Sequence, residues 1–90
     1  MPKYVIEREL PGAGSLSAAE LHSIAVKSNA VMDDMAPRVH WEHSYVTGDK
    51  IYCVYVADDA ETVAEHARAG GFPCNVVSEV ATTIDRTTGE

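Results

Sequence analysis

Residues 41–56 read Trp41-Glu-His-Ser-Tyr-Val-Thr-Gly-Asp-Lys-Ile-Tyr-Cys-Val-Tyr-Val56. Aromatic and β-branched residues, which favour strands, crowd both halves of this stretch. Gly48 and Asp49 at the junction suit a tight reversal of the chain. We therefore predict a β-hairpin in the middle of the sequence. The hairpin and the residue before it hold three side chains suited to a soft or borderline metal: His40, His43 and Cys53.

The segments on either side of the hairpin show two further strands and two helices. Residues 3–10 alternate between two faces and predict a strand. Ser17 and Glu20 have the spacing of a capping box, which starts a helix that Pro37 must end. A second helix is predicted from the acidic residues at 58–61 to Gly70-Gly71, and residues 75–84 predict the last strand.

The resulting order, β-α-β-β-α-β, is that of a ferredoxin-like fold. The expected class is therefore α+β, a sandwich of a four-stranded antiparallel sheet with two helices on one face. Residues 1–85 are expected to form this single domain, and 86–90 lack an apolar anchor and are expected to be a loose tail. A chain of 90 residues has a thin core, and its open sheet face carries aromatic residues, so we predict a homodimer.

Charge and composition limit the kinds of partner that the chain is expected to bind. The net charge of -7 argues against nucleic acid and anionic membranes and favours cations or neutral ligands. No segment has the length and apolarity of a membrane span. Cys53 and Cys74 follow no disulfide pattern and are interpreted as reduced thiols, which favours a cytoplasmic location.

The hairpin register decides which side chains share a face of the sheet. A three-residue loop at 47–49 would place His43 across from Cys53, whereas a two-residue turn at Gly48-Asp49 would send them to opposite faces. The second register, as we interpret it, buries His43 on the helix-covered side without a partner, at a cost of about 1–3 kcal/mol. We therefore predict the three-residue loop.

On that register, one side chain from each strand points away from the helices: Glu7, His43, Cys53 and Glu79. His66, in the last turn of the second predicted helix, is a further candidate ligand, although a histidine there also caps carbonyl groups. Imidazole, thiolate and carboxylate donors together suit nickel, zinc, copper or cobalt. No Cys-x-x-Cys, His-x-His or His-Glu-x-x-His motif is present.

Three segments resemble a known family. They are Pro-Lys-Tyr-Val-Ile-Glu-Arg-Glu at residues 2–9, Trp41-x-x-Ser-Tyr-Val-Thr-x-Asp-Lys-Ile-Tyr-Cys-Val-Tyr, and Glu65-His-Ala-Arg-x-Gly-Gly-Phe-Pro73 followed by Ser78-Glu-Val. These segments are similar to the small bacterial nickel-binding proteins of ferredoxin-like fold, first catalogued as a domain of unknown function. The resemblance implies a homodimer with nickel ions near its surface, which it sequesters or detoxifies without performing a reaction.

A second hypothesis uses the aromatic residues. Trp41, Tyr45 and Tyr55 would line a small-molecule site on the open sheet face of a dimer, with or without catalysis of the kind found in cofactor-free oxygenases or isomerases. Whether the chain is an enzyme stays open from the sequence, because no Asn or Asp is visibly placed to orient a catalytic histidine beside Cys53.

Overall fold

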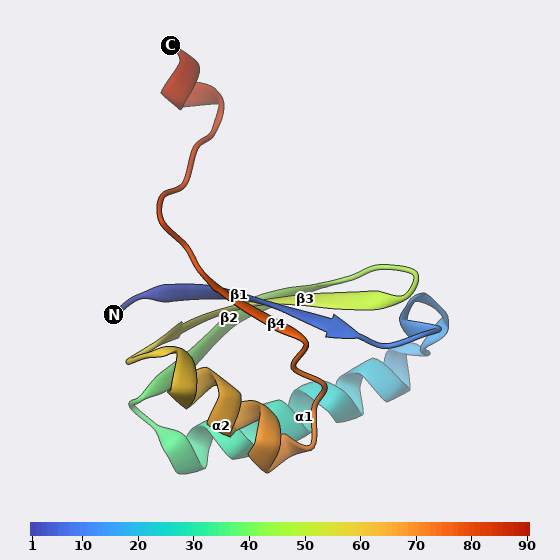
Figure 1. Cartoon of the computed structure of the whole chain (residues 1–90). Coiled ribbons are helices and arrows are strands. Elements are labelled where there is room, and N and C mark those ends of the chain that lie inside the picture. The colour runs from blue at the N-terminus through green and yellow to red at the C-terminus, as the bar shows by residue number, and fades with distance from the viewer.

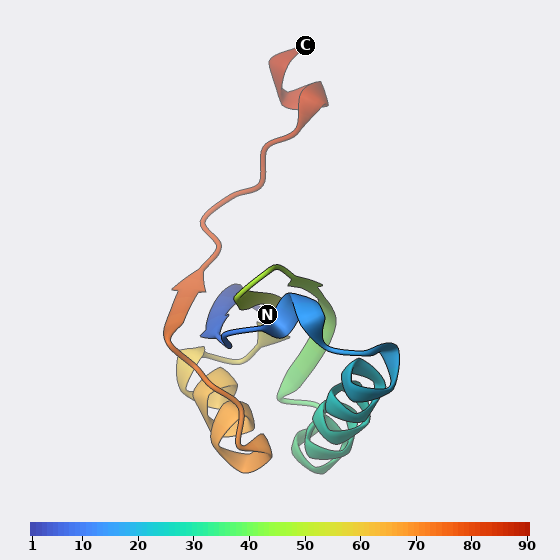
Figure 2. The ribbon, with the colours of Figure 1, turned by 90° about the vertical axis from the view of Figure 1, so that its right-hand side faces the viewer.

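The computed structural model describes residues 1–90 and contains one antiparallel sheet and two α-helices. Both helices cover the same face of the sheet (Figures 1 and 2), and the strand order is β2-β3-β1-β4. The predicted ferredoxin-like α+β fold is thereby confirmed. The elements are β1 (Lys3–Glu9), a 3₁₀ turn η1 (Ala13–Ser15), α1 (Ala18–Met35), β2 (Val39–Val46), β3 (Lys50–Ala57), α2 (Ala60–Gly70), β4 (Val76–Glu79) and a 3₁₀ turn η2 (Arg86–Gly89).

Each helix begins where a side chain satisfies its free backbone amides. At the start of α1, Oγ of Ser17 accepts a hydrogen bond from the Glu20 amide at 3.1 Å, and the Glu20 carboxylate accepts one from the Ser17 amide at 3.0 Å. Asp59 caps α2 by accepting from the Thr62 amide at 2.8 Å. Gly71, with φ of 69°, ends α2 in the left-handed conformation that glycine adopts readily.

The register of the β2–β3 hairpin differs from the predicted one. Ser44 lies opposite Cys53, and His43 lies opposite Val54. The connection is therefore the two-residue one at Gly48-Asp49, and the prediction that His43 faces Cys53 is wrong. A β-bulge between Trp41 and His43 shifts the register beyond this point, so Trp41 lies opposite Tyr55.

The three-residue loop was predicted because the wrong face of the hairpin was taken to be the one that the helices cover. Cys53 and Tyr55 lie on the side of β3 that the helices bury, together with Tyr4 and Ile6 of the neighbouring strand. The opposite side of β3 is the open face, so placing His43 there buries no unpaired imidazole. The burial cost that favoured the three-residue loop therefore does not arise.

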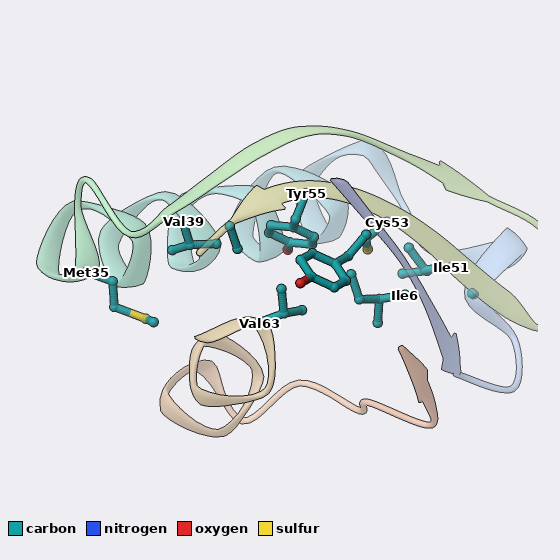
Figure 3. Packing of buried hydrophobic residues seen from close by; sticks show 10 residues of the cluster. Ile6, Met35, Val39, Ile51, Cys53, Tyr55 and Val63 are labelled. Atoms are coloured by element: carbon teal, nitrogen blue, oxygen red, sulfur yellow. The ribbon is translucent and has the colours of Figure 1, made fainter. Parts of the chain in front are cut away.

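The core lies between this covered sheet face and the helices. Figure 3 shows Ile6, Cys53 and Tyr55 pointing from the sheet toward the helix layer, where Val63 of α2 meets them. Ile6 and Val63 are fully buried. Arg8 continues the alternation of Tyr4 and Ile6 and is consequently buried as well, with only 4% of its surface exposed.

The open face carries a half-exposed apolar surface. Val5 of β1 and Tyr52, Val54 and Val56 of β3 are only partly buried there, and Tyr45 of β2 is 62% exposed. Neither α1 nor α2 combines the length and the apolar composition that a membrane-spanning helix requires.

Strand β4 is shorter than the predicted 75–84. The amide of Val80 still bonds the Lys3 carbonyl at 2.8 Å, but β1 begins at Lys3 and offers no strand beyond it. The chain after β4 consequently leaves the sheet and lies away from the domain in both views (Figures 1 and 2). Asp85 caps η2 in this segment, and the domain boundary at residue 85 stays a prediction.

Candidate functional site

Two places in the molecule collect side chains with useful chemistry. One is the open face of the hairpin, where His40 and His43 lie, and the other is a cavity on the covered side of the sheet, where Arg8 and Cys53 meet.

The imidazoles of His40 and His43 are neighbours on β2. His40 lies opposite Val56 and His43 opposite Val54, and these two valines share one side of β3. The bulge at Glu42 supplies the extra residue that brings two histidines three positions apart onto the same face. Both side chains are exposed, and the His43 ring meets the Tyr45 ring edge to face at 5.0 Å.

Two carboxylates accompany the histidines on this face, and each is paired with a lysine. Glu42 lies 3.3 Å from Nζ of Lys3, and Glu7 lies 3.4 Å from Nζ of Lys50. The hydrogen bond that Lys50 donates to Glu7 is the main cause that raises the pKa of Lys50. A cation bound to either carboxylate would have to displace its lysine.

The structure separates the remaining predicted ligands from His43. Cys53 is buried on the covered side, Glu79 lies opposite Tyr4 on that same side, and His66 is buried on α2. The prediction that one donor from each strand points away from the helices is therefore wrong for Cys53 and Glu79. Glu7 does lie on the open face, but β3 stands between it and His43.

Each of these separated side chains has a partner within the fold. The Tyr4 hydroxyl donates to Glu79 at 3.4 Å, and Nε2 of His66 lies 3.3 Å from Oγ of Ser28. Nδ1 of His66 has no partner, and burial lowers the pKa of this imidazole. One chain brings no three His, Cys, Asp or Glu side chains together into a metal site. His40 and His43 therefore form a two-donor set that is incomplete by itself.

The aromatic residues of the second hypothesis are also divided. Trp41 and Tyr55 lie on the covered side, where they line a cavity of about 220 Å³, whereas Tyr45 lies on the open face. A small-molecule site made of all three on the open face does not form.

Sequence reasoning missed Arg8, the one charged residue that lines this cavity. Its guanidinium donates to Sγ of Cys53 at 3.3 Å, to the Tyr55 hydroxyl at 3.4 Å and to the Pro73 carbonyl. The rings of Tyr55 and Phe72 lie 5.9 and 5.6 Å from its central carbon. The alternation of Tyr4, Ile6 and Arg8 was the signal, because it places a charge in line with two core residues.

Fold and topology define the class of protein: a ferredoxin-like α+β domain with one covered and one open sheet face. Within that class, the chain belongs to the SCO4226-like family, since the family model described as "Nickel responsive protein SCO4226-like" matches residues 4–80. The family resemblance seen in the sequence is thus confirmed.

A solved structure supports the fold independently. SCO4226 from Streptomyces coelicolor A3(2) superposes with a TM-score of 0.77 at 21% sequence identity, covering 91% of this chain and 99% of that chain. At this identity the likeness shows the shared fold. No curated protein matches the chain.

Proposed function

We propose that this protein binds nickel as a homodimer and sequesters the ion without transforming it. The observation that carries the proposal is the side-by-side placement of His40 and His43, both exposed, on the open face of a member of a nickel-responsive family. Nickel is then the cargo of the protein, so sequestration requires no catalytic residue.

The chemistry of the donors suits the metal. Imidazole nitrogens are common ligands for nickel, zinc and copper, whereas magnesium and calcium prefer oxygen. Side chains two positions apart on one strand face lie roughly 6.6 Å apart along the strand, and the bulge gives His40 and His43 the equivalent placement. Two imidazoles so placed can converge on one ion and leave its other positions to water or to a second chain.

Glu7 is the predicted ligand that also lies on the open face. Its salt bridge to Lys50 is partly exposed, and such pairs are worth about 0–1 kcal/mol, so a divalent cation can compete for the carboxylate. Cys53 and His66 would need local opening of the core before they could reach an ion.

The open face also supports the homodimer. Its central side chains are apolar and half-exposed, and Tyr45 adds a largely exposed ring at the hairpin edge. A symmetric contact buries the same patch on both copies. Such a contact through this face would bring the His40–His43 pair of each subunit to one interface and complete the coordination that one chain lacks.

Calorimetric titration of the tag-free protein with nickel and zinc tests the metal site. We expect binding tighter than roughly 10 μM, or about -7 kcal/mol, and a loss of at least about tenfold, 1.4 kcal/mol, in His43→Ala and in His40→Ala. His22, exposed on α1, provides the matched control. Binding weaker than this limit, or an equal loss in His22→Ala, would contradict the site.

Sedimentation equilibrium tests the dimer separately. Tyr45→Lys places a charge on the open face and should therefore weaken association of the two subunits at least about tenfold. Val26 on α1 is 52% exposed on the other side of the molecule, which makes Val26→Lys the control. A monomeric wild-type protein at all concentrations would rule out the homodimer.

A further inference from the structure

The cavity on the covered side of the sheet is apolar apart from one buried cation. It lies between α1, the covered face of β1 to β3, and the segment that follows α2, and its volume is about 220 Å³. This is below the usual range for drug-sized ligands and therefore suits a smaller molecule. Its walls include Leu21 and Ile24 from α1, Trp41 and Ile51 from the sheet, and Phe72.

Arg8 brings the only formal charge to this cavity, since no lysine, aspartate or glutamate lines it. The guanidinium forms no salt bridge with any carboxylate of the chain. Arginine stays protonated in proteins, so the charge cannot be relieved by loss of a proton. A buried charge without a counter-charge is strongly unfavourable, and such groups are normally paired.

The groups that accept hydrogen bonds from Arg8 inside the fold include no carboxylate. Burial is the main cause that raises the pKa of Tyr55, so its hydroxyl stays protonated. Together with Cys53 and the Pro73 carbonyl, Tyr55 takes hydrogen bonds from three guanidinium nitrogens. A guanidinium has five N–H groups, and three bonds leave two of them free for a ligand.

We propose that this cavity binds a small monocarboxylic acid with an apolar body, its carboxylate on Arg8 and its hydrocarbon part against the walls formed by α1 and Trp41. Arginine binds carboxylates through charged N–H donors, and each terminal nitrogen of Arg8 keeps one N–H that the bonds to Pro73 and Tyr55 do not use. The ligand would supply the missing negative charge and fill the apolar volume. Because this site lies on the opposite side of the sheet from His40 and His43, it does not depend on nickel binding.

The test uses benzoate as the probe and benzamide as its neutral analogue of similar shape. Chemical shifts of the Arg8, Cys53 and Tyr55 amides are followed during titration of the whole chain with each compound. We expect saturable shifts with benzoate at low millimolar concentration, and at least about tenfold weaker binding of benzamide because it lacks the charge.

Three variants locate the site. Arg8→Met keeps the bulk of the side chain and should bind benzoate no better than benzamide. Ala25 lines the cavity, so Ala25→Leu should abolish binding with Arg8 still present. Ala30, exposed on the same helix, gives the control Ala30→Leu, which should bind as the wild type does.

Four outcomes would overturn the proposal. One is the absence of saturable shifts below ~10 mM, a dissociation constant too weak for a specific site. Another is equal binding of benzoate and benzamide, or unchanged binding in Ala25→Leu. The fourth is an ultraviolet absorbance of a Cys53 thiolate that disappears in Arg8→Met, in a protein that does not bind benzoate. The thiolate would then be the counter-charge of Arg8.

Discussion

Nε of Arg8 donates a hydrogen bond to Sγ of Cys53 across 3.3 Å, and both side chains are buried on the covered face of the sheet. Only 4% of Cys53 is exposed, so a reagent in water reaches its sulfur only when the domain opens locally. Cys74, which precedes β4, is half-buried.

The two thiols should therefore differ in reactivity. We expect Cys74 to react first with a disulfide reagent such as dithionitrobenzoate, and Cys53 at least about tenfold more slowly, because opening costs free energy. Cys74→Ser should retain the slow phase and Cys53→Ser the fast one. A fast reaction in the Cys74→Ser protein would show that Cys53 is accessible.

His66 predicts a pH dependence of stability. Its ring is buried between Tyr55 and Phe72, with Arg8 nearby, and burial lowers its pKa from the ordinary 6.5. The unfolded chain then binds a proton at a higher pH than the folded chain does. By linkage, the free energy of unfolding decreases as pH falls through about 6.5 toward the lower folded pKa.

Urea unfolding between pH 7.5 and pH 5 measures this dependence. The wild type should lose stability over that interval, and His66→Gln should lose less, because it carries no titrating group at this position. The capping carboxylates Glu20 and Asp59, whose pKa values are lowered by hydrogen bonds to backbone amides, act only at more acidic pH. Equal pH slopes in both proteins would contradict the prediction.

Gly70 leaves room for Phe72 at the wall of the cavity. A Cβ at position 70 would lie 2.6 Å from Cδ2 of Phe72 and nearer still to Cε2. Gly70→Ala should therefore displace the Phe72 ring and destabilise the protein by about 1–3 kcal/mol, the usual cost of overpacking. Gly89→Ala provides the control, because a Cβ at position 89 has no atom within 4 Å. Urea unfolding measures both variants. A destabilisation of Gly70→Ala no larger than that of Gly89→Ala would be evidence against this contact.

The capping box of α1 should also be measurable. Ser17→Ala removes the acceptor for the Glu20 amide and should lower the free energy of unfolding by about 1 kcal/mol. Ser15 is exposed in η1, and its side chain makes no hydrogen bond, so Ser15→Ala should change stability by less than about 0.5 kcal/mol. The denaturant midpoints of the two variants measure these changes in stability. A similarly small change in both variants would mean that the capping box contributes little to the stability of the protein.

Local rules were sufficient for the fold. The capping box at Ser17, the glycine after α2 and the alternation in residues 3–9 each specify one element through contacts within a few residues. The antiparallel topology then follows from the order of the elements. The length of β4 was overestimated, because a strand ends where its partner ends, and that partner lies at the other end of the chain.

The site was harder to predict because it depends on register and on the choice of the covered face. A bulge of one residue at Glu42 aligns His40 with His43, and no local sequence signal specified it. Arg8 was overlooked because a charge in a predicted strand is usually taken to face water. Only the packing of Tyr4 and Ile6 beneath the helices shows that Arg8 is enclosed.

The most direct test of the metal site is the NMR response of the four histidine rings to substoichiometric nickel. Paramagnetic nickel broadens signals near its site, and the four rings lie in three places. His40 and His43 are neighbours on the open face, His22 is exposed on α1, and His66 is buried on α2. We expect the ring signals of His40 and His43 to broaden first, while those of His22 and His66 stay sharp. Early broadening at His22 or His66 with unchanged signals from His40 and His43 would contradict this expectation.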